Sequence, residues 1–325
     1  MKKYIFLSFL VLIAGCSLPN AAVVAELPKE NTLPTEVYFC PKDDCAGHLI
    51  KNIENAQNTI HCAVYDLDET NIIHALARKS QTADVKIVMD KDNDEGQISG
   101  EGIRLDDNNQ LSHNKFCVFD NQRVWTGSFN PTERDNTKNN NNALLIYSSY
   151  LAGNYEKEFQ ELWNGTFGRG NTVKYPAVTI NNKEIENYFC PEDRCKEHVI
   201  NALSKAEKSI HFMTFSFTEE EIADAVLFKN KLDIKGIFEK SQAGSQYSQY
   251  WRMKDFGMSV IRDTNPFNMH HKVFIIDGKT VITGSYNPTG AGSYKNDENV
   301  LIIEDDALAQ KFESEFGRLW DEFSK

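Results

Sequence analysis

Two histidines and two lysines recur in the chain at the same spacing. His113 and Lys115 open a stretch ending at Asn130, and His270 and Lys272 open its repeat 157 residues later, so the pattern HxKxxxxDxxxxxxGSxN occurs twice in full. Side chains two residues apart lie on one face of a strand, which places each His beside its Lys. Two imidazoles and two ammonium groups around one point suit a phosphodiester: one His attacks phosphorus, the other protonates the leaving oxygen, and the lysines neutralise the non-bridging oxygens.

Each copy of the pattern predicts a β-hairpin. An apolar run follows the Lys in both copies, an Asp-containing turn comes next, and a second apolar run precedes Gly-Ser-x-Asn. Such runs, separated by a turn, are typical of paired strands. The hairpin therefore carries its His and Lys at its mouth. This chemistry requires no metal or cofactor, and no carboxylates at two-metal spacing accompany the motifs.

The hairpins belong to a longer internal repeat. Residues 38–45 return at 188–195, residues 59–67 at 209–217, and the apolar positions of a helix at 151–163 return at 308–320. The offset grows from 150 to 157, which predicts a seven-residue insertion within residues 242–258. Strands alternate with helices, so we expect an α/β/α fold with mixed, largely parallel sheets. Two such repeats about a pseudo-twofold axis would form one shared active site in a monomer.

The N-terminus has the layout of an export signal. Lys2 and Lys3 precede an apolar run that is too short to span a membrane, and the run ends in Ala14-Gly15-Cys16. Residues 12–16 resemble the bacterial lipobox, which implies cleavage before Cys16 and lipidation of its thiol. The alternative is an unlipidated signal with an incidental Cys. We therefore expect an exported protein, anchored to the cell envelope through a membrane lipid on Cys16.

The chain is therefore predicted to have five segments. They are a signal peptide (1–15), a tether with the lipidated Cys16 (16–36), a first repeat (37–167), a linker (168–186) and a second repeat (187–325). Removal of Lys2 and Lys3 changes the formal net charge from −12 to −14. An acidic protein is not built for broad attraction to a polyanion, so the charge disfavours nucleic acid as the substrate.

Six further cysteines fall into two groups. Cys40 and Cys45, like Cys190 and Cys195, flank a turn in an exported chain, which predicts two local disulfides. A single zinc site with all four thiolates is the alternative, disfavoured because four residues separate each pair rather than two. Cys62 and Cys117 lie in apolar strand runs. We expect them to be buried free thiols, with a mutual bridge as the alternative.

The doubled motif resembles that of the phospholipase D superfamily, which includes phospholipases D, cardiolipin hydrolases and metal-independent nucleases. The resemblance covers residues 37–325 and implies a covalent phosphohistidine intermediate with no cofactor. It implies that His113 and His270 are the catalytic pair and that Lys115 and Lys272 bind phosphate. It also implies structural roles for Asp120 and Asp277 at the far ends of their strands, and a phosphate site lined by Ser128, Asn130, Ser285 and Asn287.

The two copies differ at one position. Glu298 lies 28 residues after His270, where the family places a carboxylate that orients the catalytic imidazole, whereas Asn141 lies 28 residues after His113. We therefore expect Glu298 to orient His270 and Asn141 to orient His113. A carboxylate raises the pKa of an imidazole, which predicts His270 as the general acid and His113 as the nucleophile. Decay of the first motif is the alternative explanation for Asn141.

The substrate class is less constrained than the reaction. A tethered enzyme with a negative net charge favours a phospholipid headgroup ester. An exported endonuclease is the alternative, and an inactive phosphate-binding module is a second one. The sequence leaves open whether water or an alcohol releases the intermediate. His271 should face away from the site, and Tyr247, Tyr250 and Trp251 should form either a lid or a helix packed on the core.

Overall fold

The computed structural model describes Met1 and residues 27–325, so the predicted signal peptide and Cys16 lie outside the described residues. The first repeat contains β2 (Glu36–Cys40), α1 (Cys45–Asn55), β3 (Thr59–Val64), α2 (Thr70–Lys79), β4 (Asp84–Met89), the 3-10 helix η1 (Lys91–Asn93), β5 (Ile103–Leu105), β6 (Lys115–Phe119), β7 (Arg123–Gly127), α3 (Glu133–Thr137), β8 (Asn141–Tyr147) and α4 (Ser149–Trp163).

The second repeat follows the same order. It contains β10 (Lys183–Cys190), α5 (Cys195–Ser204), β11 (Ser209–Thr214), α6 (Glu220–Leu227), β12 (Asp233–Phe238), α7 (Lys240–Ala243), α8 (Gln249–Asp255), β13 (Ser259–Arg262), β14 (Lys272–Ile276), β15 (Thr280–Gly284), α9 (Gly290–Tyr294), β16 (Glu298–Glu304) and α10 (Asp306–Phe323). The predicted duplication of an α/β unit is confirmed.

Each repeat builds one mixed sheet, and the two sheets have matching strand orders. In the described residues the first is β2-β8-β7-β6-β3-β4-β5, and the second contains β10-β16-β15-β14-β11-β12-β13. The expectation of largely parallel sheets was wrong, because within each repeat only β3-β4-β5 and β11-β12-β13 run parallel. The motif hairpins are closed by tight turns, and a tight turn can join only antiparallel strands.

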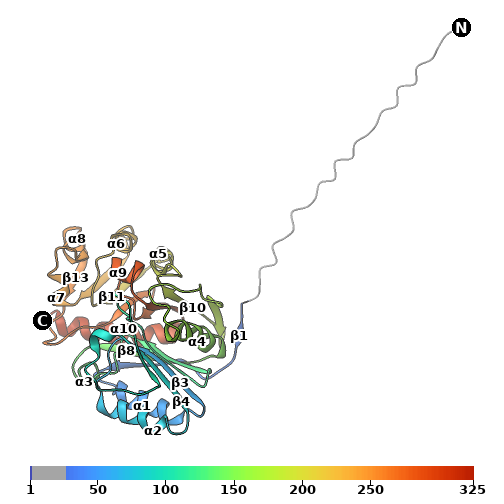
Figure 1. The fold of residues 1–325 in the computed structure, drawn as a ribbon. Coiled ribbons are helices and arrows are strands. Elements are labelled where there is room, and N and C mark those ends of the chain that lie inside the picture. The colour runs from blue at the N-terminus through green and yellow to red at the C-terminus, as the bar shows by residue number, and fades with distance from the viewer. Residues whose placement is uncertain (2–26) are drawn as a thin grey trace.

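The core lies between the sheets, around the two closing helices (Figure 1). Ser148 begins α4 by accepting from the backbone N–H of Leu151, and Asp305 begins α10 in the same way with Leu308. Both helices bury the predicted apolar face, which includes Leu151, Tyr155, Phe159, Leu308, Phe312 and Phe316. Helices α1 and α2 cover the outer face of one sheet, and α5 and α6 cover that of the other. The shared central layer holds the repeats in a fixed relation.

The predicted tether and linker are partly strand. Within the tether, β1 (Lys29–Glu30) pairs in parallel with β9 (Ala177–Ile180), which lies inside the predicted linker. Strand β9 in turn pairs with β10 and extends the second sheet. Glu30 also accepts a hydrogen bond from the backbone N–H of Ser149 at 2.9 Å. The folded part therefore begins before residue 37.

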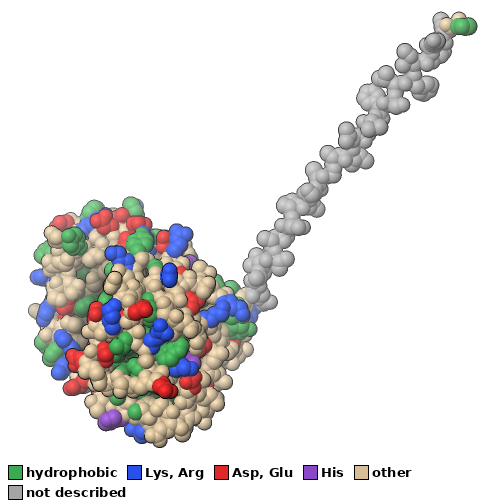
Figure 2. Space-filling model, viewed as in Figure 1, with side chains coloured by type: hydrophobic (Ala, Val, Ile, Leu, Met, Phe, Trp, Pro, Cys, Tyr) green, Lys and Arg blue, Asp and Glu red, His purple; other side chains and the backbone are tan. Residues whose placement is uncertain are grey.

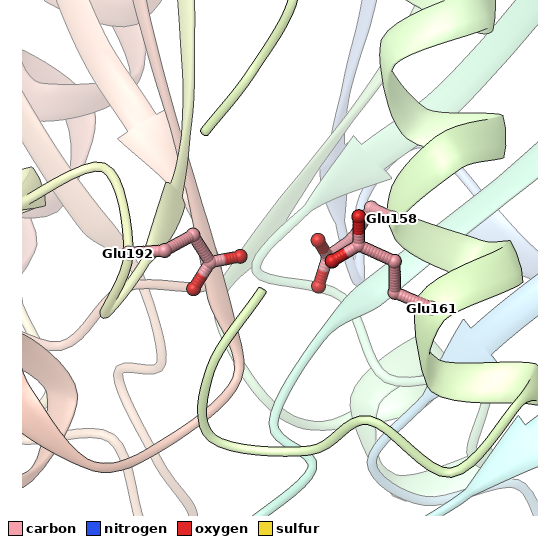
Figure 3. A group of neighbouring side chains, drawn as sticks. All are labelled: Glu158, Glu161 and Glu192. Carbon is pink, nitrogen blue, oxygen red and sulfur yellow. The ribbon is translucent and has the colours of Figure 1, made fainter. Parts of the chain in front are cut away.

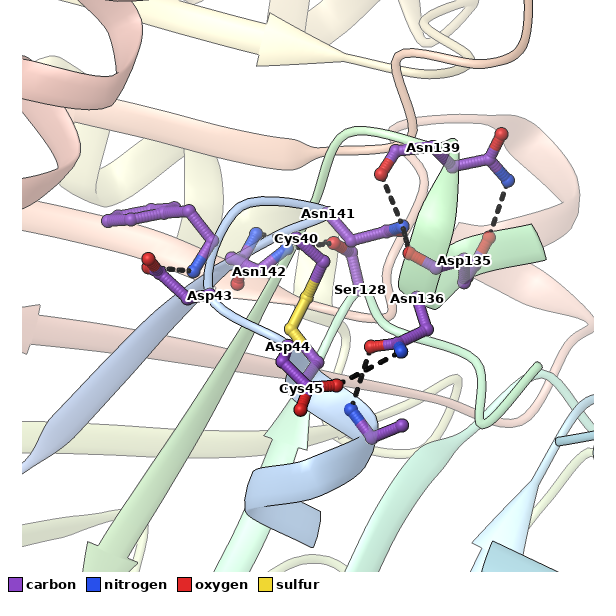
Figure 4. Close-up of a disulfide and its surroundings, with 12 residues drawn as sticks. Cys40, Asp43, Asp44, Cys45, Ser128, Asp135, Asn136, Asn139, Asn141 and Asn142 are labelled. Atoms are coloured by element: carbon purple, nitrogen blue, oxygen red, sulfur yellow. Dashed lines mark hydrogen bonds between the residues drawn. A yellow bond between two sulfur atoms is a disulfide. The ribbon is translucent and has the colours of Figure 1, made fainter. Parts of the chain in front are cut away.

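Both predicted local disulfides, Cys40–Cys45 and Cys190–Cys195, are present, so the zinc alternative is wrong. Figure 4 shows the first of them. There Asn136 of α3 accepts from the backbone N–H of Ala46 and donates to Asp44, the N-cap of α1. The disulfide turn is thereby tied to the segment that follows the first motif.

Cys62 and Cys117 form a third disulfide, so the expectation of free thiols was wrong. The two residues lie directly opposite each other on antiparallel β3 and β6, with Cα atoms 4.0 Å apart. Close cross-strand pairs of this kind bring Cβ atoms within bonding range of a disulfide. The strand register, which the sequence left open, decides the pairing.

The predicted insertion corresponds to the segment of α7 and α8. Tyr250 is buried against Phe238, which confirms the interpretation of a helix packed on the core. Tyr247 and Trp251 of the same segment remain exposed. In the described part of the chain no helix is both long and apolar enough to cross a membrane.

Candidate active site

Short backbone bridges between the repeats bring the two motifs together. The N–H of His113 donates to the carbonyl of Asp297 at 2.9 Å, and the N–H of His270 donates to that of Asn140 at 2.8 Å. Each bridge joins the residues before a motif strand to the residues before the last strand of the other repeat. Both histidines therefore lie at the repeat interface, as the sequence predicted.

Each lysine is held beside its histidine. Lys115 Nζ donates to the carbonyl oxygen of His113 at 2.7 Å, and Lys272 Nζ donates to that of His270 at 2.8 Å. Both lysines are buried. Their two ammonium groups remain able to donate further hydrogen bonds, because an ammonium carries three N–H groups.

Two aromatic residues that the sequence analysis missed complete the pairs. Lys115 Nζ lies 5.0 Å from the ring centre of Tyr65, and Lys272 Nζ lies 4.9 Å from that of Phe215. The same rings meet His113 and His270 edge to face at 4.8 Å. The sequence did carry a signal, since positions 65 and 215 follow equivalent strands and both are aromatic.

The histidine partners are exchanged between the repeats, which corrects the predicted pairing. His113 Nδ1 lies 2.8 Å from Glu298 Oε2, and His270 Nδ1 lies 2.9 Å from Asn141 Oδ1. The backbone bridges are the physical reason, because they place the start of β16 beside His113 and the start of β8 beside His270. Partners within one repeat were the wrong expectation. Glu298 and Asn141 are nevertheless the residues that orient the two imidazoles.

His270 has a second, more distant neighbour. Asp135 Oδ2 lies 3.6 Å from His270 Nδ1 and accepts from both the backbone N–H and the side-chain amide of Asn130. Asp135 belongs to α3 and lies near Asn141, the first residue of β8 (Figure 4). The equivalent position in the second repeat, 157 residues later, is Gly292. Both imidazoles therefore have a carboxylate nearby, but the two carboxylates come from different positions of the repeat.

Burial and charge set the protonation of the site. Burial, followed by the charges of the two lysines, lowers the pKa of His113 and His270 well below the ordinary value. Burial also lowers the pKa of Lys115 to about 8 and that of Lys272 well below its usual range. For Glu298, burial raises the pKa to about 8. A bound phosphodiester would place a negative charge beside the two histidines and the two lysines. That charge would favour the protonated forms of these four side chains.

The four predicted phosphate-site residues have unequal surroundings. Ser128 Oγ accepts from the backbone N–H of Asn142 at 3.0 Å, and Ser285 Oγ accepts from that of Asn299 at 2.9 Å. Each serine thus links its hairpin to the last strand of its own repeat. No described group is hydrogen-bonded to the buried Oδ1 atom of Asn130 or Asn287. Direct contact of these residues with phosphate stays a prediction.

Asp120 and Asp277 hold the far ends of the motif strands. Asp120 accepts backbone hydrogen bonds from residues 57–59, and Asp277 accepts them from residues 207–209. These contacts fix the loop that enters the neighbouring strand. The structural role predicted for both residues is therefore confirmed, and neither touches the histidines.

Reciprocal polar contacts also join the repeats behind the site. Asn299 Nδ2 donates to Asn114 Oδ1 at 2.9 Å, and Asn142 Nδ2 donates to His271 Nδ1 at 3.0 Å. Asn114 and His271 are the residues that follow His113 and His270 in the sequence. His271 thus takes part in the repeat interface, consistent with its predicted place on the opposite strand face.

Comparison with known proteins agrees with this geometry. The family described as "Cardiolipin synthase, PLD-like domain" matches residues 49–163 and 199–320, one segment in each repeat. The chain therefore belongs to the phospholipase D-like family.

Individual relatives match different shares of the chain. A phospholipase D of Rickettsia typhi is 31% identical over 140 residues, which cover 42% of this chain and 69% of that protein. A mitochondrial cardiolipin hydrolase of Chlamydomonas reinhardtii is 33% identical over 126 residues, 38% of this chain and 56% of that protein. The crystal structure of phosphatidylserine synthase from Haemophilus influenzae Rd KW20 matches 87% of this chain and 86% of that chain, with a TM-score of 0.66 and 14% identity. The last match shows that the two-repeat fold is shared.

Proposed function

We propose that this protein is a phosphodiesterase that cleaves a phospholipid headgroup ester through a phosphohistidine intermediate. One observation carries the proposal: two buried His–Lys pairs, one from each repeat, meet at a single interface. The Nδ1 atom of each imidazole is occupied by Glu298 or Asn141, which directs Nε2 to the substrate. Family membership supports the same reaction class.

In the proposed reaction His113 is the nucleophile. Its Nε2 attacks phosphorus, the P–N bond forms as the P–O bond to the leaving group breaks, and His270 gives its Nε2 proton to the departing oxygen. Water then attacks phosphorus, His270 takes a proton from it, and the P–N bond breaks. The two lysines neutralise the non-bridging oxygens throughout.

The observed partners, Glu298 with His113 and Asn141 with His270, also support His113 as the nucleophile and His270 as the general acid. An imidazole that attacks phosphorus becomes positively charged, and the carboxylate of Glu298 beside His113 would stabilise that charge. The amide of Asn141 orients His270 without a formal charge, so His270 releases its proton more readily. The roles are those predicted from the sequence, although the predicted pairing was wrong.

Three features favour a phospholipid. The relatives named above include a phospholipase D and a cardiolipin hydrolase. Lys and Arg side chains on the face shown in Figure 2 are scattered among Asp and Glu rather than gathered, unlike the basic surface of a nucleic-acid-binding protein. The α8 segment presents Tyr247, Trp251 and Phe256 with exposures of 70%, 49% and 65%, and aromatic side chains suit a membrane interface.

The decisive experiment compares substrates. The chain lacking residues 1–16 is incubated with labelled phospholipid vesicles containing cardiolipin and, separately, with single-stranded DNA, alongside His113→Ala. Release of the headgroup product by the unaltered protein only is the expected result. Turnover of DNA alone would replace the lipid proposal with the nuclease, and turnover of neither would favour a phosphate-binding module. Added ethanol reports whether an alcohol competes with water for the intermediate.

A second experiment tests the membrane contact. Trp251→Ala with Phe256→Ala should lower turnover of vesicles several-fold while leaving turnover of a soluble diester, bis(p-nitrophenyl) phosphate, unchanged. An equal loss on both substrates would contradict a role at the bilayer. We also propose that the full chain is exported and anchored through Cys16. Mass spectrometry of the membrane fraction should find a diacylglyceryl group on Cys16, and an unmodified N-terminus would contradict the anchor.

A further inference from the structure

Three glutamates from the two repeats meet away from the histidines. Glu158 and Glu161 lie on α4, and Glu192 lies in the turn between β10 and α5; their carboxyl groups point toward one another (Figure 3). One oxygen from each lies within 4.8 Å of the others. The cluster thus links the closing helix of the first repeat to the disulfide turn of the second.

Glu158 is buried, Glu161 and Glu192 are half-buried, and within residues 27–325 no ion pair with a basic side chain is formed at the cluster. Glu158 is only 5% exposed, and the hydrogen-bond partner of its carboxyl group is another acid, Glu192, which it faces. Glu192 Oε2 is buried and lacks a partner there. Glu161 accepts hydrogen bonds from the backbone and side-chain N–H groups of Asn171. Neighbouring carboxyl groups that are withdrawn from water with no cation beside them are costly to ionise, which indicates a missing positive ligand.

The pseudo-symmetric position shows how the fold otherwise meets this need. The counterparts of Glu158 and Glu161 are Glu315 and Arg318, which form an ion pair with contacts of 2.6 and 2.9 Å. The counterpart of Glu192, 150 residues earlier, is Lys42, which lines the same cavity as Arg318. Two built-in cations in one half thus correspond to two further carboxylates in the other half.

We propose that Glu158, Glu161 and Glu192 bind a divalent cation of the calcium type. Carboxylate oxygens are the preferred ligands of Ca²⁺, and Ca–O distances of roughly 2.3–2.6 Å allow two ligand oxygens to lie up to about 5 Å apart. One oxygen from each glutamate lies within that span of the others.

The cation would stabilise the repeat interface rather than take part in the reaction. It would join α4 to the Cys190–Cys195 turn, beside Asp297, whose carbonyl oxygen accepts from His113. Sequence analysis predicted no metal site, because Glu158 and Glu192 lie in different repeats and no spacing links them. The proposed cation site is tested by ion binding and by stability. If these tests fail, the proposed phosphodiesterase activity is unaffected.

Binding is tested first with Ca²⁺ alone. The chain lacking residues 1–16 is stripped with chelator and titrated with Ca²⁺ by equilibrium dialysis and calorimetry. We expect one ion per chain, and none in Glu158→Gln with Glu192→Gln, whereas the exposed control Glu207→Gln should bind as the unaltered protein does. Absence of saturable binding up to about 1 mM, the range of weak extracellular calcium sites, would overturn the proposal, as would unchanged binding in the double variant.

A second variant guards against misfolding of the first. Glu161→Arg with Glu192→Lys installs the charges of the symmetric position, so it should melt in chelator at or above the temperature of the Ca²⁺-loaded parent. Added Ca²⁺ should not shift its melting temperature, although it raises that of the parent. A Ca²⁺ shift that persists in this variant would place the ion elsewhere and overturn the proposal.

Discussion

The two repeats share a strand order but differ at several equivalent interior positions. The cross-strand pair of Cys62 and Cys117 corresponds to Phe212 and Phe274, which are also directly opposite each other. The catalytic-site partners Asn141 and Glu298 differ in the same way, as do the buried charges on α4 and α10. A duplicated backbone therefore fixes where groups lie, while their chemistry has diverged between the halves.

Neighbouring residues compensate for each divergence. Phe212 fits because Gly236 lies beside it on β12, where an added Cβ would come within 2.0 Å of the Phe212 ring. In the first repeat the residue paired with Cys62 on β4 is Ile87. The second repeat thus pairs the large Phe212 with Gly236, where the first repeat pairs the smaller Cys62 with the larger Ile87. The surroundings of the histidines show a similar compensation. Asp135 supplies a carboxylate near His270, where the partner is the amide of Asn141, and the equivalent Gly292 accompanies the carboxylate of Glu298.

The largest expected effect separates the two histidines. Both His113→Ala and His270→Ala should lower kcat/KM for phospholipid by about 10³-fold or more, because each removes a catalytic group. With bis(p-nitrophenyl) phosphate, whose leaving group needs no proton, His270→Ala should regain much of its activity and His113→Ala should not. Recovery by His113→Ala instead, or phosphate trapped on His270, would reverse the roles.

The next effect concerns the disulfide present in one repeat only. Replacing Cys62 and Cys117 with valine should lower the free energy of unfolding by about 4 kcal/mol, because the bridge closes a 55-residue loop in the unfolded chain. The same change at Cys40 and Cys45, five residues apart, should cost about 2 kcal/mol. Urea unfolding measures both. Equal losses would show that loop length does not govern the difference.

A third effect distinguishes the two histidine partners. Glu298→Gln should lower kcat about 100-fold, because the amide no longer stabilises the charge that forms on His113. Asn141→Asp adds a charge beside His270 and should raise the pKa of that imidazole, which shifts the alkaline limb of the pH profile for kcat/KM upward. Single-turnover rates across pH test both changes. A larger loss from Asn141→Asp than from Glu298→Gln would contradict the assignment.

The smallest effect tests whether the two carboxylates are interchangeable. Asp135→Gly should lower kcat/KM about tenfold by removing the negative charge near His270. Combining it with Asn141→Glu reproduces the second repeat, with Gly292 and Glu298, and should restore activity to within a few-fold. Circular dichroism confirms that both variants fold. Absence of rescue in a folded double variant would show that Asp135 acts only by holding Asn130 through hydrogen bonds.

Much of the framework follows from local sequence patterns. The pattern of apolar residues predicted both hairpins and the buried face of α4 and α10, because these features depend on residues close in sequence. The structural role of Asp120 and Asp277 was implied by the resemblance of the motif to the phospholipase D superfamily. The proportion of parallel strands was wrong, since apolar runs do not reveal strand direction. Tyr65 and Phe215 were missed because a single aromatic after a strand has no special spacing.

By itself the sequence determined the duplication, the types of chemical group and the local disulfides, because short-range spacing encodes each of them. Only the tertiary structure decided which groups meet. His113 reaches Glu298 across 185 residues, and His270 reaches Asn141 across 129, because backbone bridges cross between the repeats. The register of β3 and β6 joins Cys62 to Cys117, and the docking of α4 on the second repeat gathers three glutamates. Long-range contacts of this kind depend on how the whole chain packs, which no local pattern specifies.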